Sequence, residues 1–210
     1  MNIAVISHAA AKPTVDLFKP HWQRLNADLN IYHPEGEAAG ADYQIGISAY
    51  RGQNCVRRFI KTAQHALDHS SDEWLCVMEY DTVNLIAEWP KLYPDRMNAG
   101  LFDLYDTGNL TPGNHCALSP WIAQRPIWSR VLEALKADLA KPLPEWTLGG
   151  LLDRCIGHAL KTHAIPRANI LQLLAYPWRD DAHKQIAARG ITWVHGWKTK
   201  EDFGPLFPTL

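Results

Sequence analysis

Long hydrophobic runs are missing from this 210-residue chain, and none approaches the roughly 20 residues that a membrane-spanning helix needs. The first residues, Met1 to His8, lack the charged start and the long apolar core of a signal peptide. Cysteine occurs only four times, and no pair has the short spacing of a zinc site or a redox dithiol. We therefore expect buried free thiols and a cytoplasmic location without membrane contact.

Several catalytic signatures are also missing. The chain has no Gly-x-Ser-x-Gly elbow, which argues against serine hydrolase chemistry of that type, and no Gly-rich phosphate loop with its Lys-Ser/Thr pair. The formal net charge of −1 gives no overall basic field for nucleic acid or membrane surfaces. With 47% hydrophobic residues and no internal repeat, the composition is that of one globular domain over residues 1–210.

The first eighty residues alternate between two kinds of hydrophobic pattern. Short apolar runs predict strands at Ile3 to Ile6, Leu29 to Tyr32, Tyr43 to Ile47 and Trp74 to Glu79. Apolar residues at helical spacing predict helices over Thr14 to Leu25 and Arg51 to His69. This alternation predicts an α/β fold with a mainly parallel central sheet flanked by helices. Ligands of such sheets bind at the carboxyl ends of the strands.

The second half of the chain is less regular. Pro, Gly, Asp and Asn residues predict loops between Trp89 and Pro112. Hydrophobic patterning predicts a strand at His115 to Ser119, a helix within Pro120 to Leu139, another helix over Leu148 to Thr162, and late strands at Ile170 to Leu174 and Ile191 to Val194.

The run from Trp74 to Asp81 is the most informative stretch of the chain. Its apolar residues end abruptly in two carboxylates, Glu79 and Asp81, which are separated by a single residue. Alternate residues of an extended chain point the same way, so both side chains project together beyond the strand. Two converging anions repel unless a cation lies between them, and Mn²⁺ or Mg²⁺ takes oxygen ligands of this kind. The other interpretation is a strand end with two solvated acids.

A second polar element follows the last predicted strand. His195 comes directly after Trp193 and Val194, and it is followed by Gly196 and Lys198. Neutral imidazole is a good ligand for Mn²⁺, glycine lets the backbone approach a ligand closely, and lysine provides a point charge for phosphate. The alternative is a partly buried histidine beside core tryptophans. Together with the carboxylate pair, the metal interpretation is favoured.

These two elements resemble those of nucleotide-sugar glycosyltransferases of the GT-A fold. Glu79-Tyr80-Asp81 stands where that family has its Asp-x-Asp motif. His195-Gly196-Trp197-Lys198 is similar to the His-x-x-Gly-x-x-Lys element of glycogenin-like members, with a shorter spacing from His to Lys. The resemblance implies a nucleotide-binding half over residues 1–85, and an acceptor half with a metal-binding tail over residues 86–210. It also implies Asp81, His195 and Glu79 as metal ligands.

The resemblance places nucleotide recognition in two segments. One is the loop after the first strand, with Ser7 and His8, where the backbone can meet a uracil-like base. The other is the helix that carries Arg51, Asn54 and Arg58, whose spacings of three and four residues put them on one helical face. That face contacts the base or the diphosphate in GT-A enzymes. A solvated basic helix face is the alternative.

The resemblance leaves the catalytic base open. An inverting transferase needs a carboxylate to deprotonate the acceptor hydroxyl, and Asp153 is the first candidate, with Glu145 the second. Asp153 follows a Gly-Gly pair that lets a substrate approach the start of the helix. The alternative is that Asp153 pairs with Arg154 or Arg130. A retaining enzyme would need no such base.

The expected function is therefore a metal-dependent glycosyltransferase, a hexosyl- or related transferase. The donor is a nucleotide diphosphate sugar, most readily a UDP-sugar, and the acceptor hydroxyl belongs to a saccharide, a protein or a modified nucleic-acid base. Trp121 and Trp146 are candidates for lining the acceptor site. Two alternatives stay open: a nucleotidyltransferase, and a non-catalytic domain that binds nucleotide sugars. The sequence leaves the oligomeric state undetermined.

Overall fold

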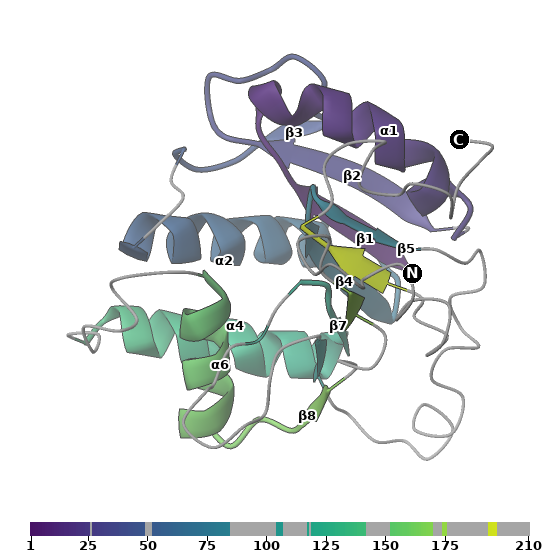
Figure 1. The fold of residues 1–210 in the computed structure, drawn as a ribbon. Helices are drawn as coiled ribbons and strands as arrows, with labels where there is room; N and C mark the ends of the chain where they lie inside the picture. The colour runs from purple at the N-terminus through teal and green to yellow at the C-terminus, as the bar shows by residue number, and fades with distance from the viewer. Residues whose placement is uncertain are drawn as a thin grey trace.

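A central sheet separates two layers of the molecule (Figure 1). The structure is a computed structural model, and it describes residues 1–25, 27–48, 52–84, 104–106, 117, 119–141, 152–169, 174–175 and 193–196. Helix α1 (Lys12–Gln23) covers one face of the sheet. Three helices cover the other face: α2 (Gly52–Asp68), α4 (Arg125–Leu139) and α6 (Leu152–Thr162). A short 3-10 helix, η1 (Ala9–Ala11), precedes α1.

The large sheet has the strand order β3-β2-β1-β4-β7-β6-β8. Its strands are β1 (Asn2–Ile6), β2 (Asp28–His33), β3 (Tyr43–Gln44), β4 (Trp74–Glu79), β6 (Leu104–Asp106), β7 (Trp121–Gln124) and β8 (Arg167–Asn169). The first four strands run parallel to one another, β7 is antiparallel to both β4 and β6, and β8 is parallel to β6. The predicted α/β fold with a mainly parallel sheet is therefore confirmed.

Burial explains why β1 and β4 are continuous apolar runs in the sequence. Both strands lie in the interior of the sheet, and both of their faces are covered, as is usual in parallel sheets. Successive side chains alternate between the two layers: Ala4 and Val77 pack on the side of α2, whereas Val5 and Met78 pack on the side of α1. This packing holds the carboxyl ends of the two strands side by side, with Ile6 paired to Glu79.

The tryptophans within the described residues belong largely to these two cores. Trp121 and Trp128 pack against Phe59 on the side of α2, and Trp22 and Trp193 are buried on the side of α1. Trp121 is 1% exposed, and its indole nitrogen donates a 2.8 Å hydrogen bond to the carbonyl of Ala117. The expectation that Trp121 lines an acceptor site is therefore wrong, because its ring fills the core.

The strand predicted at residues 115–119 is also misplaced. The structure describes Ala117 and Ser119 as non-strand residues, and the strand that pairs with β4 on the side away from β1 is β7, at the start of the predicted helical segment. A short run that is buried on both faces has the same apolar pattern in a strand as in a helix, so periodicity does not separate them. Helix α4 begins directly after β7, at Arg125.

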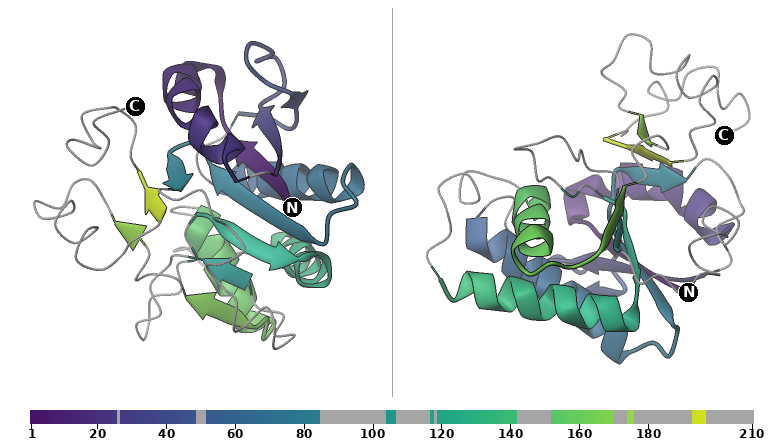
Figure 2. Two further views of the ribbon diagram at one scale, coloured as in Figure 1. Left: turned by 90° about the vertical axis from the view of Figure 1, so that its right-hand side faces the viewer. Right: turned by 90° about the horizontal axis from the view of Figure 1, so that it is seen from below.

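A small second sheet lies beside the first and has the order β5-β10-β9 (Figure 2). Its strands are β5 (Thr82–Asn84), β9 (Leu174–Ala175) and β10 (Trp193–His195). Strand β10 is antiparallel to β5 and parallel to β9. The predicted late strand near residue 193 is thus present, and of the one predicted at 170–174 only residue 174 is described. Within the described ranges, no helix has the length and hydrophobicity that crossing a bilayer requires.

Candidate metal and nucleotide site

Two strand ends and one turn bring the predicted metal ligands together. Glu79 is the last residue of β4, Asp81 lies in the turn between β4 and β5, and His195 is the last residue of β10. Strand β10 pairs with β5 so that His195 lies opposite Thr82. The turn is therefore held from both sides, and the far end of the chain supplies the imidazole.

The geometry of these three side chains suits a shared cation. One ligand atom from each of Glu79, Asp81 and His195 lies within 4.8 Å of the other two. The His195 Nε2 atom is 3.7 Å from a Glu79 carboxylate oxygen, and its Nδ1 atom is 3.9 Å from an Asp81 oxygen. These separations are longer than hydrogen bonds. A cation takes only one nitrogen of an imidazole, so the set of ligand atoms that suits one cation is the one with a single atom from each residue, all within 4.8 Å.

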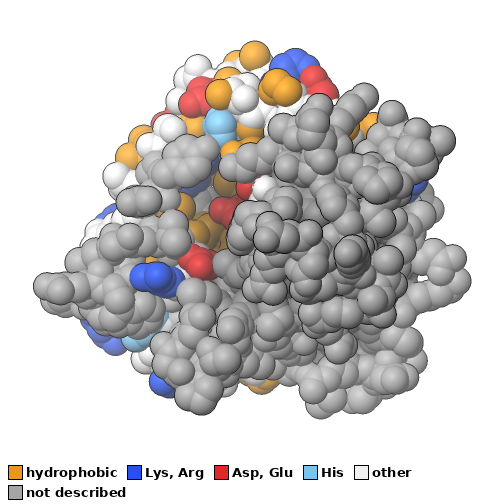
Figure 3. All heavy atoms as spheres, viewed as in Figure 1, with side chains coloured by type: hydrophobic (Ala, Val, Ile, Leu, Met, Phe, Trp, Pro, Cys, Tyr) orange, Lys and Arg blue, Asp and Glu red, His pale blue; other side chains and the backbone are white. Residues whose placement is uncertain are grey.

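Exposure differs among the three ligands. The Asp81 and His195 side chains are each 13% exposed, whereas that of Glu79 is 39% exposed. Figure 3 shows carboxylate side chains within a hollow, between the layer that holds α1 and the layer that holds α2 and α6. Oxygen and imidazole ligands that are mostly buried but retain some exposure fit a hard divalent cation that also binds a substrate.

Backbone contacts hold the turn in place. The amide of Gly196 donates a 2.9 Å hydrogen bond to the Asp81 carbonyl, and the indole nitrogen of Trp22 donates a 3.0 Å hydrogen bond to the carbonyl of Thr82. Gly196 has a φ angle of +81°, in the left-handed region that favours glycine. A glycine directly after His195 therefore allows β10 to end against the carboxylate turn.

The loop after β1, which the resemblance assigns to nucleotide recognition, lies next to this turn. The amide of Tyr80 donates a 3.1 Å hydrogen bond to the Ile6 carbonyl, and the ring of His8 packs edge-on against Tyr80 at 5.0 Å. Ser7 is 1% exposed, and its amide donates a 2.9 Å hydrogen bond to the Tyr32 carbonyl. His8 is thus the more accessible residue of the pair, and base recognition by either one stays a prediction.

Arg58 points inward from α2. Its guanidinium donates hydrogen bonds to the carbonyls of Ser7 and Tyr32, the latter at 3.0 Å, and the residue is 8% exposed. Gly46 packs against the stem of this side chain, because the position of its missing Cβ lies 3.3 Å from the Arg58 Cγ atom. The guanidinium of Arg58 is therefore engaged by main-chain carbonyls where β1 and β2 end. Its predicted contact with the base or diphosphate is not tested by this arrangement.

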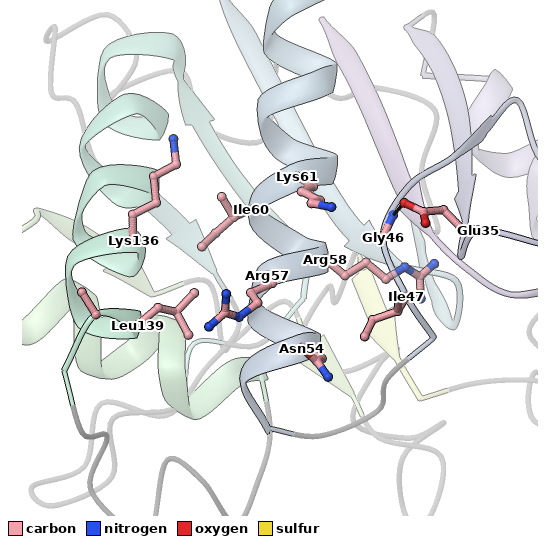
Figure 4. Close-up of a pocket in the computed structure, with 11 residues that line it drawn as sticks. Glu35, Gly46, Ile47, Asn54, Arg57, Arg58, Ile60, Lys61, Lys136 and Leu139 are labelled. Atoms are coloured by element: carbon pink, nitrogen blue, oxygen red, sulfur yellow. Dashed lines mark hydrogen bonds between the residues drawn. The ribbon is translucent and has the colours of Figure 1, made fainter.

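A cavity of about 600 Å³ opens over the amino-terminal half of α2 (Figure 4). Asn54 lies on its wall, together with the cationic side chains of Arg57, Lys61 and Lys136. Figure 4 shows Arg57 extending toward α4 and Arg58 toward Gly46. Glu35 is the one carboxylate among the residues that line it within the described ranges. This balance of charge favours an anionic group as an occupant.

Asp153, the candidate base, lies at the start of α6. Its carbonyl accepts a 2.9 Å hydrogen bond from the Ala117 amide, and its side chain is half-buried. Burial raises the pKa of the Cys55 thiol to about 12, and the Glu79 and Asp153 carboxylates both add to this rise. Cys55 therefore stays a neutral thiol and is no nucleophile.

Three predicted residues, Arg51, Glu145 and Lys198, lie outside the described residues, as does Trp146. The cysteines that the structure describes are free thiols, as expected, and Cys76 and Cys155 are buried. Thr82 and Ser119, whose hydroxyls contact the site directly, were not predicted from the sequence. The one feature of the sequence that could have pointed to their role is that Thr82 directly follows the predicted metal ligand Asp81.

Comparison with solved structures shows which known proteins share this fold. No protein-family model matches the chain, and no curated protein matches it. Solved structures of similar fold include a glycosyltransferase involved in the glycosylation of the major capsid of PBCV-1. It has a TM-score of 0.55 and 12% identity, and the match covers 96% of this chain and 98% of that one. Galactosyltransferase LgtC, in complex with donor and acceptor sugar analogs, has a TM-score of 0.55 and 8% identity over 95% and 88% of the two chains.

A third similar structure is the glycosyltransferase GlyE of Streptococcus pneumoniae. Its TM-score is 0.52 at 11% identity, with 92% of this chain and 54% of that chain covered. Identities this low establish the fold and nothing finer. The chain therefore has the α/β fold of GT-A glycosyltransferases, with a Glu-x-Asp pair and a late histidine gathered at the carboxyl end of its parallel strands.

Proposed function

We propose that this protein is a metal-dependent glycosyltransferase that moves a sugar from a nucleotide diphosphate sugar, most readily a UDP-sugar, to an acceptor hydroxyl. The observation that carries the proposal is the convergence of Glu79, Asp81 and His195 within 4.8 Å, at the strand ends of a fold shared with glycosyltransferases. Strand ends of this kind are where open α/β sheets bind their ligands.

In this proposal, Asp81 and His195 are the principal ligands of Mn²⁺ or Mg²⁺. Both side chains are mostly buried and are held by the pairing of β5 with β10, which keeps their ligand atoms in place before a substrate arrives. The more exposed Glu79 would complete the site from its solvent-accessible side. A cation bound there would supply positive charge opposite the departing diphosphate. Lys198 is proposed to contact the same diphosphate.

The donor is proposed to lie along the carboxyl ends of β1 and β4. The backbone around Ser7 and His8 would meet the base, because it adjoins the carboxylate turn through Tyr80. Asn54, which is exposed at the cationic cavity, is the residue of α2 that remains available to the donor. The acceptor is proposed to be a saccharide, a protein or a modified nucleic-acid base.

The deciding experiment replaces Asp81 with Asn in the full chain. Mn²⁺ affinity is measured by calorimetry, and hydrolysis of a panel of UDP-sugars is followed with and without Mn²⁺. We expect Asp81→Asn to weaken Mn²⁺ binding and to lower metal-dependent turnover by about 100-fold or more, because it removes a charged ligand. The matched control is Asp16→Asn, which makes the same change at an exposed carboxylate of α1.

The outcomes separate the alternatives. Turnover that survives unchanged in Asp81→Asn would refute the metal-dependent mechanism. Stabilisation of the folded protein by UDP-sugars with Mn²⁺, in the absence of turnover with any acceptor, would instead identify a non-catalytic nucleotide-sugar-binding domain. Release of pyrophosphate from a nucleoside triphosphate and a sugar phosphate would identify a nucleotidyltransferase.

A further inference from the structure

A chain of hydroxyl groups lies behind the candidate metal ligands. The Thr82 Oγ1 atom is 2.8 Å from the Nδ1 atom of His195 and 2.8 Å from the Oγ atom of Ser119. The amide of Glu79 donates a 2.9 Å hydrogen bond to the same Ser119 oxygen. Thr82 and Ser119 are both 0% exposed. These contacts therefore connect the imidazole at one end of the chain with the backbone of the carboxylate pair, through two buried side chains.

The direction of these hydrogen bonds decides which nitrogen of His195 carries a proton. A hydroxyl group has a single hydrogen to donate. If Thr82 donates to Ser119, its oxygen only accepts from His195, so Nδ1 bears the hydrogen and Nε2 is the unprotonated nitrogen of the neutral ring. If Ser119 donates to Thr82, the threonine hydrogen is free to point at Nδ1, and the hydrogen of the neutral ring is then on Nε2.

Geometry favours the first arrangement for a metal site. The Nε2 atom faces the Glu79 carboxylate, at 3.7 Å, whereas Nδ1 is hydrogen-bonded to Thr82 and has an Asp81 oxygen 3.9 Å away. A ring nitrogen binds a cation only through a free lone pair, and the tautomer of a ligating histidine is set by the hydrogen bond of its other nitrogen. The Nδ1–H tautomer therefore leaves Nε2 unprotonated on the side of Glu79.

We propose that Thr82 is a positioning residue, supported by Ser119, that holds His195 as the Nδ1–H tautomer with Nε2 directed at the cation site. This inference rests on the proposed metal-dependent function. Thr82 occupies this place because it is paired with His195 across β5 and β10. Ser119 is held between Thr82 and the Glu79 amide, so the same chain orients one ligand and secures the backbone of another.

The main test uses Thr82→Val, which keeps the branched shape and removes the oxygen, with Thr82→Ser as the variant that keeps the hydroxyl. Two quantities are measured on the full chain. Long-range ¹H–¹⁵N spectra of ¹⁵N-histidine-labelled, metal-free protein at high pH report which ring nitrogen bears the hydrogen. The His195 signals are those lost in His195→Gln. Mn²⁺ affinity is measured by calorimetry under the same buffer conditions.

We expect His195 to carry its hydrogen on Nδ1 in the unaltered protein and in Thr82→Ser. In Thr82→Val, the Nδ1–H form should lose its dominance, and Mn²⁺ affinity should fall by roughly 10-fold or more, as for other residues that orient a ligating histidine. Thr82→Ser should stay within about threefold of the unaltered protein. A residue that only fills the core would change stability without changing the tautomer.

Two results would overturn the proposal: a His195 hydrogen on Nε2 in the unaltered protein, or a folded Thr82→Val variant with unchanged tautomer and unchanged Mn²⁺ affinity. If Thr82→Val does not fold, Ser119→Ala takes its place, with the same expected direction of both changes. If the unaltered protein binds no Mn²⁺ at all, the proposed metal-dependent function fails. The tautomer of His195 in the unaltered protein and in Thr82→Val then decides by itself whether Thr82 orients the ring.

Discussion

Arg58 donates a 3.0 Å hydrogen bond to the main-chain carbonyl of Tyr32 at the end of the neighbouring strand β2. The same guanidinium also donates to the Ser7 carbonyl at the end of β1. A single buried cation on α2 therefore joins the carboxyl ends of two parallel strands, where the loop that leads toward the candidate site begins. This makes Arg58 a structural support for the predicted nucleotide loop.

Replacement of Arg58 with Met should destabilise the protein. The change removes hydrogen bonds from a charged donor to two carbonyls in a buried setting, and bonds of this kind contribute about 1.5–3 kcal/mol each. We expect a loss of about 2–4 kcal/mol in the free energy of unfolding, measured by urea denaturation. Arg57→Met, one residue earlier on the exposed side of α2, is the control and should change it by less than about 0.5 kcal/mol. Equal stabilities would contradict the assigned role.

Replacement of Asp153 with Asn tests the candidate base. If Asp153 deprotonates the acceptor, sugar transfer should fall by about 10²–10⁴-fold, whereas Mn²⁺ and donor affinity should stay within about twofold, because Asp153 does not belong to the metal triad. Single-turnover transfer to acceptor and calorimetric donor binding are the two measurements. Glu133→Gln on the exposed face of α4 is the control. Full activity in Asp153→Asn would point to a retaining reaction or to Glu145.

The stability of the fold should decrease below neutral pH because of His21. This histidine is 1% exposed, and burial, followed by the nearby charge of Arg24, lowers its pKa from 6.5 to about 4. Between these values the unfolded chain binds a proton that the folded protein excludes, so stability is complete above pH 6.5 and is lost as pH falls toward 4. The loss is at most about 3 kcal/mol for this group. Burial lowers the pKa values of His33 and His65 in the same direction.

The measurement is urea denaturation at several pH values between 7.5 and 4.5. His21→Gln removes the buried titrating group, so its free energy of unfolding should fall less steeply with pH than that of the unaltered protein. His158→Gln on α6 is the control, because it also removes one imidazole from the protein. Identical pH slopes for the unaltered protein and His21→Gln would show that the burial of His21 does not govern the acid sensitivity.

The site was predictable where a local pattern carried the information. The apolar run into Glu79 and Asp81 has the signature of a fully buried strand, and the structure ends β4 at Glu79. His195 was placed near a strand end because Trp193 and Val194 precede it, and both are buried in β10. In both cases a short apolar run was enough to predict a strand that ends in a polar residue, because a strand that is buried on both faces requires an unbroken apolar run.

Arg58 shows where local patterns fail. Its spacing from Asn54 places both on one face of α2, and the sequence alone did not reveal that Arg58 points inward. Helix α2 is enclosed by the sheet on one side and by α4 and α6 on the other, so its buried stripe is wide and includes a charged residue. The carbonyls that compensate this charge belong to β1 and β2, which lie far away in the sequence.

The order of apolar and polar residues along the chain was sufficient to define the alternating strands and helices, the acids at the end of β4 and the histidine at the end of β10. It did not specify that β10 pairs with β5, that Thr82 and Ser119 lie behind His195, or that β7 runs against β4. Periodicity reports which side of a segment is buried, but not which distant segment covers it. The choice of partner depends on packing and backbone hydrogen bonding across the whole molecule, which arise only when the layers assemble.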